Sequence, residues 1–381
     1  MHIVADENIP GVESAFGDAA MVTRVTGRNL QPNQLAHCDV LLVRSVTRVD
    51  EALLASTPVR FVGTATSGMD HIDREYLAQS GIGFAHAPGS NANSVVEYVL
   101  AAIADTDDYL EQLLAGGRVG IVGYGHIGKA LVARLHALGI GSVISDPWLA
   151  GQCPQAAASL EEVLACKVVS LHPELTSAEP WPSYHLLADA QLRRLAKGQL
   201  LINASRGPVI DNRALLHRLQ ASAAPDVVLD VWEHEPMVDA GLLARVRRGS
   251  AHIAGYSYDG KLLATRMLRD AVVEHLGVNI AADNLEAGEE QTTITLAGFC
   301  TVADTLRELI RQCYSIEEDD ALLRVAVNNQ DETHCRQNFD ALRRQYRCRR
   351  ELLGRRVNLA GNRDLLGIAQ ALGCVADNSR E

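Results

Sequence analysis

The sequence predicts an α/β protein with two Rossmann-like domains, each a doubly wound parallel sheet, with a cleft between them and a small C-terminal α+β domain. Three observations lead to this prediction. Short apolar runs alternate with helix-like segments in two successive series, which is typical of βαβ units in parallel sheets. A glycine-rich turn follows the first run of the second series. From about residue 286 onward, strand-like runs become rarer and charged residues more frequent.

Composition narrows the class of protein. The 381 residues are 47% hydrophobic, which is enough for two or three separate cores. A formal net charge of −12 argues against a nucleic-acid binder, because phosphate backbones require a basic face. No apolar run reaches the length of a membrane span, and the N-terminus resembles a strand and not a secretory signal. The eight cysteines form no CxxC pair, which predicts reduced thiols in the cytoplasm and no metal site.

The two series of apolar runs predict two sheets. The first series is HIVAD (2–6), DVLLV (39–43), RFVGTA (60–65) and IGFAHA (82–87). The second series is RVGIVG (118–123), SVISD (142–146), VVSLH (168–172), QLLINA (199–204), DVVLDV (226–231) and AHIAG (251–255). Two long helices, within residues 87–105 and 256–277, are predicted to carry the chain to the second domain and back. The carboxyl ends of both sets of strands would then face the cleft, where such folds bind ligands.

The strongest local motif is GYGHIG, which follows a predicted strand and opens a predicted helix. Gly123 allows the tight turn, Gly125 lets the backbone approach a pyrophosphate, and Gly128 allows close packing of helix on strand. The amides near His126 and Ile127 would meet the phosphates at the helix N-terminus. The motif therefore predicts a dinucleotide-binding domain.

Asp146 favours NAD over NADP as the dinucleotide. It ends the next predicted strand, 23 residues after Gly123. A carboxylate there accepts hydrogen bonds from both ribose hydroxyls and repels a 2′-phosphate. The alternative is that Asp146 only caps the loop before Pro147.

Arg206, Glu235 and His252 are the candidate catalytic residues, because each lies at or just beyond the carboxyl end of a predicted strand. An imidazole can remove a hydroxyl proton near neutral pH, and a neighbouring carboxylate can orient the ring. A guanidinium can bind a substrate carboxylate through two hydrogen bonds. Each residue alone has a structural alternative, as a packed histidine, an acid before a proline or a surface charge. Their joint placement favours a catalytic role for the three residues together, in hydride transfer to NAD.

The motifs between residues 87 and 255 resemble those of the D-2-hydroxyacid dehydrogenase family. In order, they are APGSNANSVVEY (87–98), GYGHIG (123–128), NASRGPVID (203–211), DVWEHEP (230–236) and HIAG (252–255). In that family the Arg, Glu and His of these motifs are catalytic. The resemblance therefore implies these roles for Arg206, Glu235 and His252.

Further segments resemble family members that oxidise 4-phospho-D-erythronate, a phosphorylated sugar acid, in vitamin B6 synthesis. They are DENIP (6–10), LLVRSVT (41–47), FVGTATSGMDHID (61–73), HIAGYSYDGK (252–261) and FDALRRQYRCRREL (339–352). The resemblance implies substrate contacts at Ser45, Thr66 and Tyr256. It implies NAD contacts at Asp146, Ala204, Ser205, Arg206, Asp230 and Gly255. Arg44 is a further candidate for the substrate phosphate, on charge and position alone.

The resemblance also implies a domain organisation. We expect a substrate-binding domain over residues 1–95, completed by residues 256–285. An NAD-binding domain over 96–255 and a C-terminal domain over 286–381 that forms a homodimer would follow. The arginines between residues 343 and 356 are interpreted as a solvated face paired with the acidic residues 317–320. The alternative is that one or two of them reach an anionic ligand across a subunit interface.

One motif departs from the family, and two other functions stay open. The family usually reads HTPL where this chain reads HPEL, so that Pro173 cannot donate the hydroxyl hydrogen bond of a threonine. We expect NAD to be bound more weakly or through different waters at this point. The first alternative function is another phospho-2-hydroxyacid dehydrogenase, such as one acting on 3-phosphoglycerate. The second is a non-catalytic NADH-binding scaffold.

Overall fold

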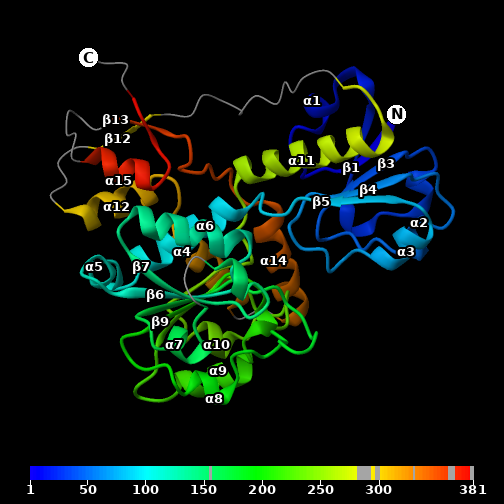
Figure 1. Ribbon diagram of the computed structural model, residues 1–381. Coiled ribbons are helices and arrows are strands. Elements are labelled where there is room, and N and C mark those ends of the chain that lie inside the picture. Colours follow the sequence, from blue (N-terminus) through cyan, green and yellow to red (C-terminus); the bar gives the residue numbers. More distant parts are fainter. Residues whose placement is uncertain (154–156, 281–292, 297–300, 329–330, 359–364, 378–381) are drawn as a thin grey trace. The chain divides into compact units, whose positions relative to one another are not determined.

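The computed structural model describes residues 1–153, 157–280, 293–296, 301–328, 331–358 and 365–377 (Figure 1). Contacts between residues divide the chain into two compact units. Unit 1 comprises Met1–Asn91 and Tyr256–Glu290, and unit 2 comprises Ala92–Gly255 and Gln291–Glu381. Each unit is therefore built from two separate stretches of chain. No helix in the described ranges is long and apolar enough to cross a membrane.

Unit 1 contains a parallel five-stranded sheet with the order β2-β1-β3-β4-β5. Its strands are β1 His2–Asp6, β2 Met21–Val25, β3 Val40–Val43, β4 Phe61–Thr64 and β5 Gly83–His86. Strand β2 was not among the strands predicted from the sequence. This strand lies at the sheet edge and only its last residue is buried, so it lacks the continuous apolar run of an inner parallel strand.

Helices cover both faces of this sheet. Helices α1 (Val12–Phe16) and α11 (Tyr258–Leu276) pack on one face, where Leu268 of α11 is buried with Ile3 and Phe61. Helices α2 (Glu51–Leu54) and α3 (Arg74–Gln79) belong to the core on the other face. The predicted helix that returns the chain to the first domain is thus confirmed as α11, which completes unit 1.

Unit 2 contains a parallel six-stranded sheet with the order β11-β10-β9-β8-β6-β7. Its strands are β6 Arg118–Val122, β7 Gly141–Ser145, β8 Val168–Leu171, β9 Leu200–Asn203, β10 Asp226–Leu229 and β11 Arg248–Gly249. The prediction of a strand over 251–255 was wrong, because these residues form a loop. The amides of Ile253 and Ala254 bind the Asp230 carboxylate instead of a neighbouring strand.

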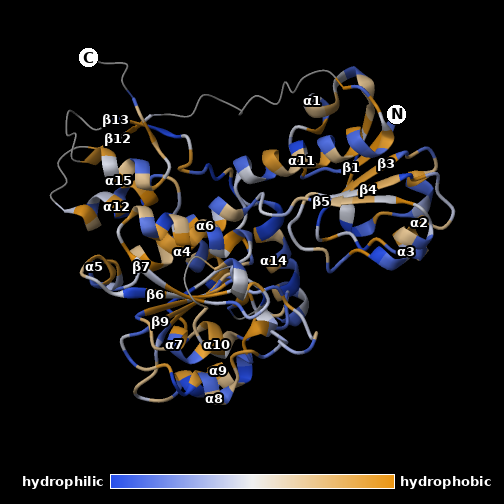
Figure 2. Cartoon of the chain, viewed as in Figure 1, coloured by the Kyte–Doolittle hydropathy of each residue, from blue (hydrophilic) through white to orange (hydrophobic). Residues whose placement is uncertain are grey.

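The helices of unit 2 begin with α4 (Ala92–Asp105), in which eleven consecutive residues from Ser94 to Ala104 are buried. Figure 2 shows α4 and the strands of this sheet as mostly hydrophobic. The others in the nucleotide-binding part are α5 Tyr109–Leu114, α6 His126–Ala137, α7 Leu160–Leu164, α8 Asp189–Leu192, α9 Asn212–Leu219 and α10 Ala240–Leu243.

The C-terminal segment forms a small parallel sheet with the order β12-β13-β14 and helices beside it. Its strands are β12 Ile294–Thr295, β13 Arg356–Asn358 and β14 Val375–Ala376. Its helices are α12 Val302–Arg311, α13 Ile316–Val327, α14 Glu332–Arg344 and α15 Leu366–Ala371. The two larger parallel sheets and this small third one confirm the predicted fold class.

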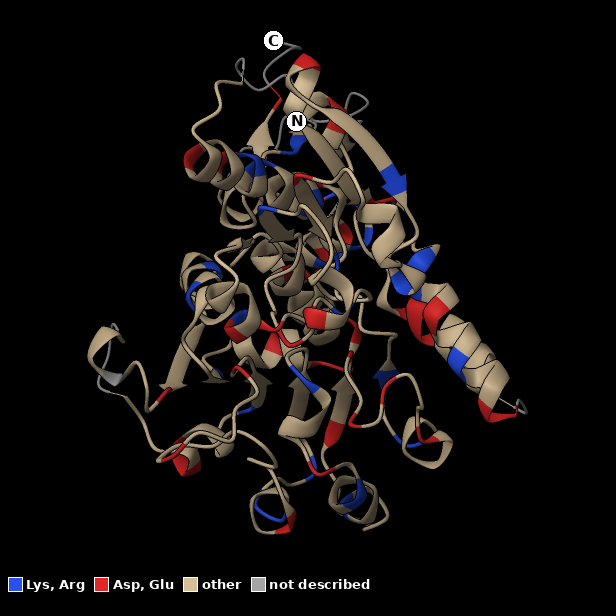
Figure 3. Ribbon diagram, turned by 90° about the vertical axis from the view of Figure 1, so that its right-hand side faces the viewer, with Lys and Arg blue, Asp and Glu red and all other residues tan. Residues whose placement is uncertain are grey.

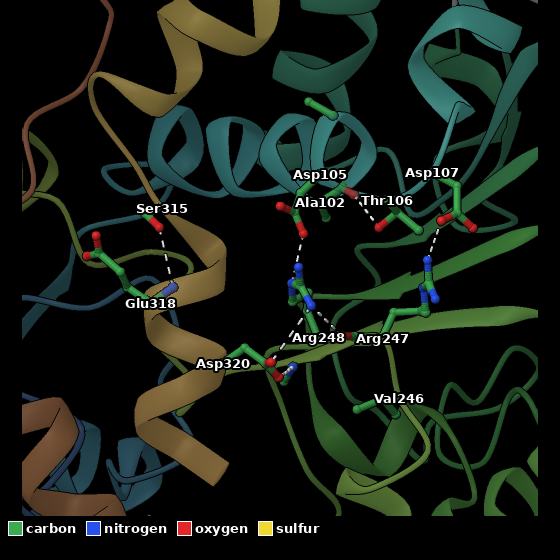
Figure 4. Close-up of polar contacts among 12 residues, drawn as sticks. Ala102, Asp105, Thr106, Asp107, Val246, Arg247, Arg248, Ser315, Glu318 and Asp320 are labelled. Carbon is green, nitrogen blue, oxygen red and sulfur yellow. Dashed lines mark hydrogen bonds and ion pairs between the residues drawn. The ribbon is translucent and has the colours of Figure 1, made fainter. Parts of the chain in front are cut away.

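Polar and apolar contacts attach the C-terminal segment to the six-stranded sheet. Leu323 and Phe339 share a buried core with Trp232. On α13, the Asp320 carboxylate accepts a hydrogen bond from the Gly249 amide at 2.8 Å and forms an ion pair with Arg324. Figure 4 shows Asp320 beside Arg248, whose guanidinium also pairs with Asp105 at 2.7 Å. The segment therefore covers the β11 edge of the sheet.

Acidic and basic residues are interspersed along the helices and loops (Figure 3). The predicted pairing of C-terminal arginines with residues 317–320 is confirmed for Arg347, which lies 2.6 Å from Glu318 and 3.4 Å from Asp319. It is wrong for Arg349, whose side chain is fully buried.

Candidate active site

The glycine turn connects β6 to α6. Gly123 adopts φ 94°, and a Cβ there would lie 2.6 Å from the carbonyl of His172. A Cβ on Gly125 would meet no atom of the described residues within 4 Å beyond its chain neighbours, so the space before it is open. No side chain of the described residues caps α6 at Gly125. The free amides and the open space fit the pyrophosphate of a dinucleotide.

Asp146 follows β7 and faces this turn. Its carboxylate is buried and accepts hydrogen bonds from the Tyr124 amide at 2.7 Å and the Trp148 and Leu149 amides at 3.0 Å. The loop-capping role that the sequence left open is therefore present. The carboxylate also lies beside the glycine turn, where an acid that binds a ribose is placed in Rossmann domains.

His172 and Pro173 belong to the segment that departs from the family pattern. The buried His172 ring lies 2.9 Å from the Ser170 hydroxyl, and burial lowers the pKa of this histidine to about 3. The backbone of both residues lies against Gly123, close enough to exclude any side chain there. The segment therefore supports the glycine turn through its backbone.

Arg206 lies in a turn after β9 that Asn203 organises. The Asn203 side chain accepts hydrogen bonds from the Ser205 amide and hydroxyl and donates one to the Arg206 carbonyl. A Cβ on Gly207 would lie 2.0 Å from the backbone of Trp232, so this turn packs directly on the loop that carries Glu235. The Arg206 guanidinium donates to the Ser205 carbonyl at 2.9 Å.

Glu235 and His252 are in direct contact. Glu235 Oε2 lies 2.8 Å from His252 Nδ1, and Glu235 Oε1 accepts a hydrogen bond from the Trp232 amide. Burial works to raise the pKa of Glu235, but His252, the Trp232 amide and Arg343 together hold this pKa below its ordinary value. Glu235 is therefore an ionised acceptor, which places the imidazole proton on Nδ1 and leaves Nε2 able to accept another.

Asp230 holds the loop that carries His252. Its buried carboxylate accepts hydrogen bonds from the Ser250 hydroxyl and from the Ile253 and Ala254 amides, at 2.7 to 2.9 Å. Its backbone carbonyl accepts one from the His252 amide, and His252 adopts φ 55°. A positive φ in a residue with a side chain is strained and persists only where the surroundings enforce it. Asp230 thus fixes the backbone of the loop that carries the His252 imidazole.

All four predicted substrate residues belong to unit 1, and two of them, Arg44 and Tyr256, lie close together. The Arg44 guanidinium lies 5.3 Å from the centre of the Tyr256 ring, although 212 positions separate the two in the sequence. Thr66 Oγ1 donates to the Gly68 carbonyl and bonds the Thr64 hydroxyl. Ser45 is exposed in the turn after β3. Of the other predicted cofactor residues, Ala204 and Ser205 follow β9, Asp230 follows β10, and Gly255 lies in the loop after β11.

Two cations near these groups were not among the predicted site residues. Lys261 Nζ lies 5.0 Å from the centre of the Tyr256 ring, in the first turns of α11. Its place in the YSYDGK segment was the available signal. Arg343 on α14 acts on the Glu235 carboxyl through its charge, and no local pattern connects two residues so distant in sequence.

Two family models match the chain. Residues 92–253 match the NAD binding domain of D-isomer specific 2-hydroxyacid dehydrogenases. Residues 288–373 match a domain of unknown function. The first match confirms NAD as the predicted cofactor.

Solved structures of related enzymes share the fold. The NAD⁺-bound 3-phosphoglycerate dehydrogenase of Entamoeba histolytica superposes with a TM-score of 0.62 at 21% identity, covering 73% of this chain and 96% of its own. The D-lactate dehydrogenase of Aquifex aeolicus, solved with NAD and lactic acid, gives a TM-score of 0.58 at 21% identity over 73% and 98%.

Curated relatives match almost the whole chain. The erythronate-4-phosphate dehydrogenase of Marinobacter nauticus is 44% identical over 95% of this chain and 96% of its own length. That of Pseudomonas aeruginosa is 41% identical over 98% and 99%. The chain therefore belongs to the erythronate-4-phosphate dehydrogenase family, a branch of the D-isomer specific 2-hydroxyacid dehydrogenases.

Proposed function

We propose that this chain oxidises carbon 2 of 4-phospho-D-erythronate and passes the hydride to NAD, giving 2-oxo-3-hydroxy-4-phosphobutanoate in pyridoxine biosynthesis. The observation that carries the chemistry is the 2.8 Å contact between Glu235 and His252 beside the Arg206 turn. The substrate follows from the relatives, whose similarity extends over both units and the C-terminal segment.

His252 is the general base in this proposal. With Nδ1–H donating to the Glu235 carboxylate, Nε2 takes the proton of the carbon 2 hydroxyl. Glu235 stabilises the imidazolium that results, because it is already ionised. Arg206 binds the substrate carboxylate, for which a guanidinium offers two parallel N–H donors.

NAD supplies the hydride acceptor when bound. We propose that the glycine turn, with Gly123, Gly125, His126, Ile127 and Gly128, holds its pyrophosphate through backbone amides. Asp146 would bind the ribose hydroxyls. Ala204, Ser205, Asp230 and Gly255 would line the nicotinamide end. The open space before Gly125 and the absence of a capping side chain among the described residues support this placement.

The substrate phosphate is assigned to Arg44, with Lys261 as a second cation. Both positive groups lie within 5.3 Å of the Tyr256 ring centre, which restricts their positions. A dianionic phosphate suits two converging cations. Ser45, Thr66 and Tyr256 are the proposed neutral contacts to the sugar acid.

The decisive experiment replaces the proposed base. His252→Asn should lower kcat by roughly 10²- to 10⁴-fold, the usual contribution of general base catalysis, while NADH binding stays close to that of the parent enzyme. Turnover is followed by NADH absorbance with 4-phospho-D-erythronate, and binding by NADH fluorescence. His185→Asn is the matched control, because His185 pairs with Glu233 in the same region at 2.5 Å. Near-parental turnover in the His252 variant would reject the assignment.

The same assay separates the alternative functions. A pocket built for a four-carbon phospho-acid should prefer 4-phospho-D-erythronate over 3-phosphoglycerate by orders of magnitude in kcat/KM. The reverse preference would assign the chain to the second substrate. NADH binding without turnover of either acid would indicate a scaffold.

We also propose that the chain acts in the cytoplasm as a homodimer formed through the C-terminal segment. The free thiols of the seven cysteines in the described ranges support a reducing compartment; Cys300 lies outside those ranges. On α13 the side chains of Leu322 and Val325 are 49% and 73% exposed, which suits a subunit contact. Sedimentation analysis of the intact chain tests the dimer, and a monomer at micromolar concentration would contradict it.

A further inference from the structure

Arg349 of the C-terminal segment binds backbone close to two of the places where the chain crosses between the units. The residue lies after α14 and its side chain is fully buried. One guanidinium nitrogen donates to the Ser94 carbonyl at 2.8 Å, and the other to the Ala254 carbonyl at 3.3 Å. Ser94 follows the boundary at residue 92 and Ala254 precedes the boundary at residue 255. A single side chain therefore binds the start and the end of the nucleotide-binding stretch.

The surroundings of Arg349 hold it in this position. Its guanidinium lies 3.5 Å from the Glu97 carboxylate and 4.1 Å from the centre of the Tyr314 ring. Glu97 also accepts a hydrogen bond from the Leu352 amide at 2.6 Å. Burying a guanidinium without such partners would be strongly unfavourable. The cluster is therefore a built contact, specific in geometry, between the C-terminal segment and α4.

This contact lies two residues from the proposed base. The Ala254 carbonyl accepts hydrogen bonds from Arg349 and from the Ser94 hydroxyl, while the Ala254 and Ile253 amides donate to Asp230. Residues 252–254 are thus held at their amides by Asp230 and at a carbonyl by Arg349. Removing either set would allow the strained backbone at His252 to relax.

We propose that Arg349 is a positioning residue, which makes the C-terminal segment part of the catalytic apparatus by fixing the loop that carries His252. The inference rests on the proposed role of His252 as the base. A guanidinium is required because it serves two carbonyls and a carboxylate at once, which a lysine ammonium does only in part.

The test compares Arg349→Met and Arg349→Lys with Arg307→Met in the intact enzyme. Arg307 is a matched control, because it also joins the C-terminal segment to α4. It donates to the Ala104 carbonyl and pairs with Glu111, but at the far end of that helix. Each variant is assayed for thermal unfolding, NADH affinity, kcat, KM and the pH profile of kcat.

We expect Arg349→Met to lower kcat roughly 10- to 100-fold, the effect of misplacing a reacting group by about 1 Å, with NADH affinity retained. Arg349→Lys should restore part of the loss. His252 contacts Glu235 and acts on Asp230 through its charge, while Arg343 acts on Glu235. A loosened loop weakens the Glu235 contact that stabilises the imidazolium. The acid limb of the kcat profile should then move to lower pH. Arg307→Met should lower the unfolding temperature while leaving kcat and the profile unchanged.

Two outcomes would overturn the proposal. One is an unchanged kcat and pH profile in folded Arg349→Met or, if that variant does not fold, in Arg349→Lys. The other is an equal loss of kcat in the Arg307 variant, which would indicate a general effect of the C-terminal segment. Failure of the proposed function is seen separately, as full activity of His252→Asn.

Discussion

At the scale of single residues, His172 supports the glycine turn and also makes the stability of the fold sensitive to acid. Burial holds its pKa at about 3, below the value of about 6.5 expected in the unfolded chain. As the pH falls below about 6.5, the unfolded chain therefore binds the proton first. The stability that the neutral histidine contributes is complete above that pH and is lost as the pH falls toward 3.

His172→Asn should remove this dependence. The difference in free energy of unfolding between parent and variant should shrink by about 2 kcal/mol between pH 7.5 and pH 5, in favour of the variant. Urea unfolding at the two pH values measures it. His136→Asn, a change at an exposed histidine on α6, is the control. If the difference in free energy of unfolding for His172→Asn did not change with pH, the His172 ring would take up a proton as readily in the folded chain as in the unfolded chain.

Arg44 and Lys261 make the preference for a phosphorylated substrate testable. Arg44→Met and Lys261→Met should each raise KM for 4-phospho-D-erythronate roughly 10-fold or more, since each removes a charge-assisted contact worth about 1.5 to 3 kcal/mol. The kcat/KM for unphosphorylated erythronate should stay nearly constant. Arg48→Met is the control, because Arg48 is 84% exposed and paired with Asp50. Equal losses of kcat/KM on both substrates would show that the two cations stabilise the fold and do not bind the phosphate.

At the scale of elements, the turn between β6 and α6 contains two glycines with different requirements. Gly123→Ala should destabilise the protein, because it combines φ 94° with a Cβ 2.6 Å from the His172 carbonyl. Gly125→Ala should leave the unfolding temperature within a few degrees of the parent and weaken NADH binding at least about 10-fold, because its methyl group would enter open space needed by the pyrophosphate. Thermal unfolding and NADH titration of the two variants test these expectations. An unchanged NADH affinity in Gly125→Ala would show that the pyrophosphate does not bind at this turn.

The sequence predicts some of these elements and not others. The turn at Gly123 and the Glu235–His252 pair were predictable, because parallel strands deliver their carboxyl ends to one edge of a sheet. The loop over 251–255 was predicted to be a strand because its residues are apolar. Its amides at Ile253 and Ala254 donate to the Asp230 carboxylate and not to a neighbouring strand. The position of Arg349 could not be predicted. Its partners lie 95 and 255 residues away, and burial of an arginine opposes its usual preference.

At the scale of the whole molecule, Glu97 makes the attachment of the C-terminal segment depend on pH. Burial raises the pKa of Glu97 to about 7, although Arg349 acts in the opposite direction. Because the folded-state pKa exceeds the ordinary 4.5, this group favours the folded state fully below pH 4.5 and loses that contribution as the pH rises toward 7.

Glu97→Gln should therefore gain stability relative to the parent as the pH rises from 5 to 8. Thermal unfolding at both pH values measures the change. Glu111→Gln is the control at the other C-terminal contact, where Arg307 holds the pKa of Glu111 below its ordinary value. Since that group loses its contribution only in acid, its difference from the parent should stay constant over this range. A constant difference in both variants would contradict the role of Glu97.

The division of unit 1 into two stretches sets an order for events during translation. The face of the five-stranded sheet that buries Ile3 and Phe61 is closed by α11, whose last residue follows β5 by about 190 positions. At roughly 5–20 residues per second, the ribosome needs about 10–40 s to supply that cover. The contiguous strands of unit 2 emerge meanwhile. We expect chains stalled before residue 258 to be cut by protease within residues 1–91 and chains released at full length to resist, because the strands of unit 1 are made first but wait for α11 to cover them.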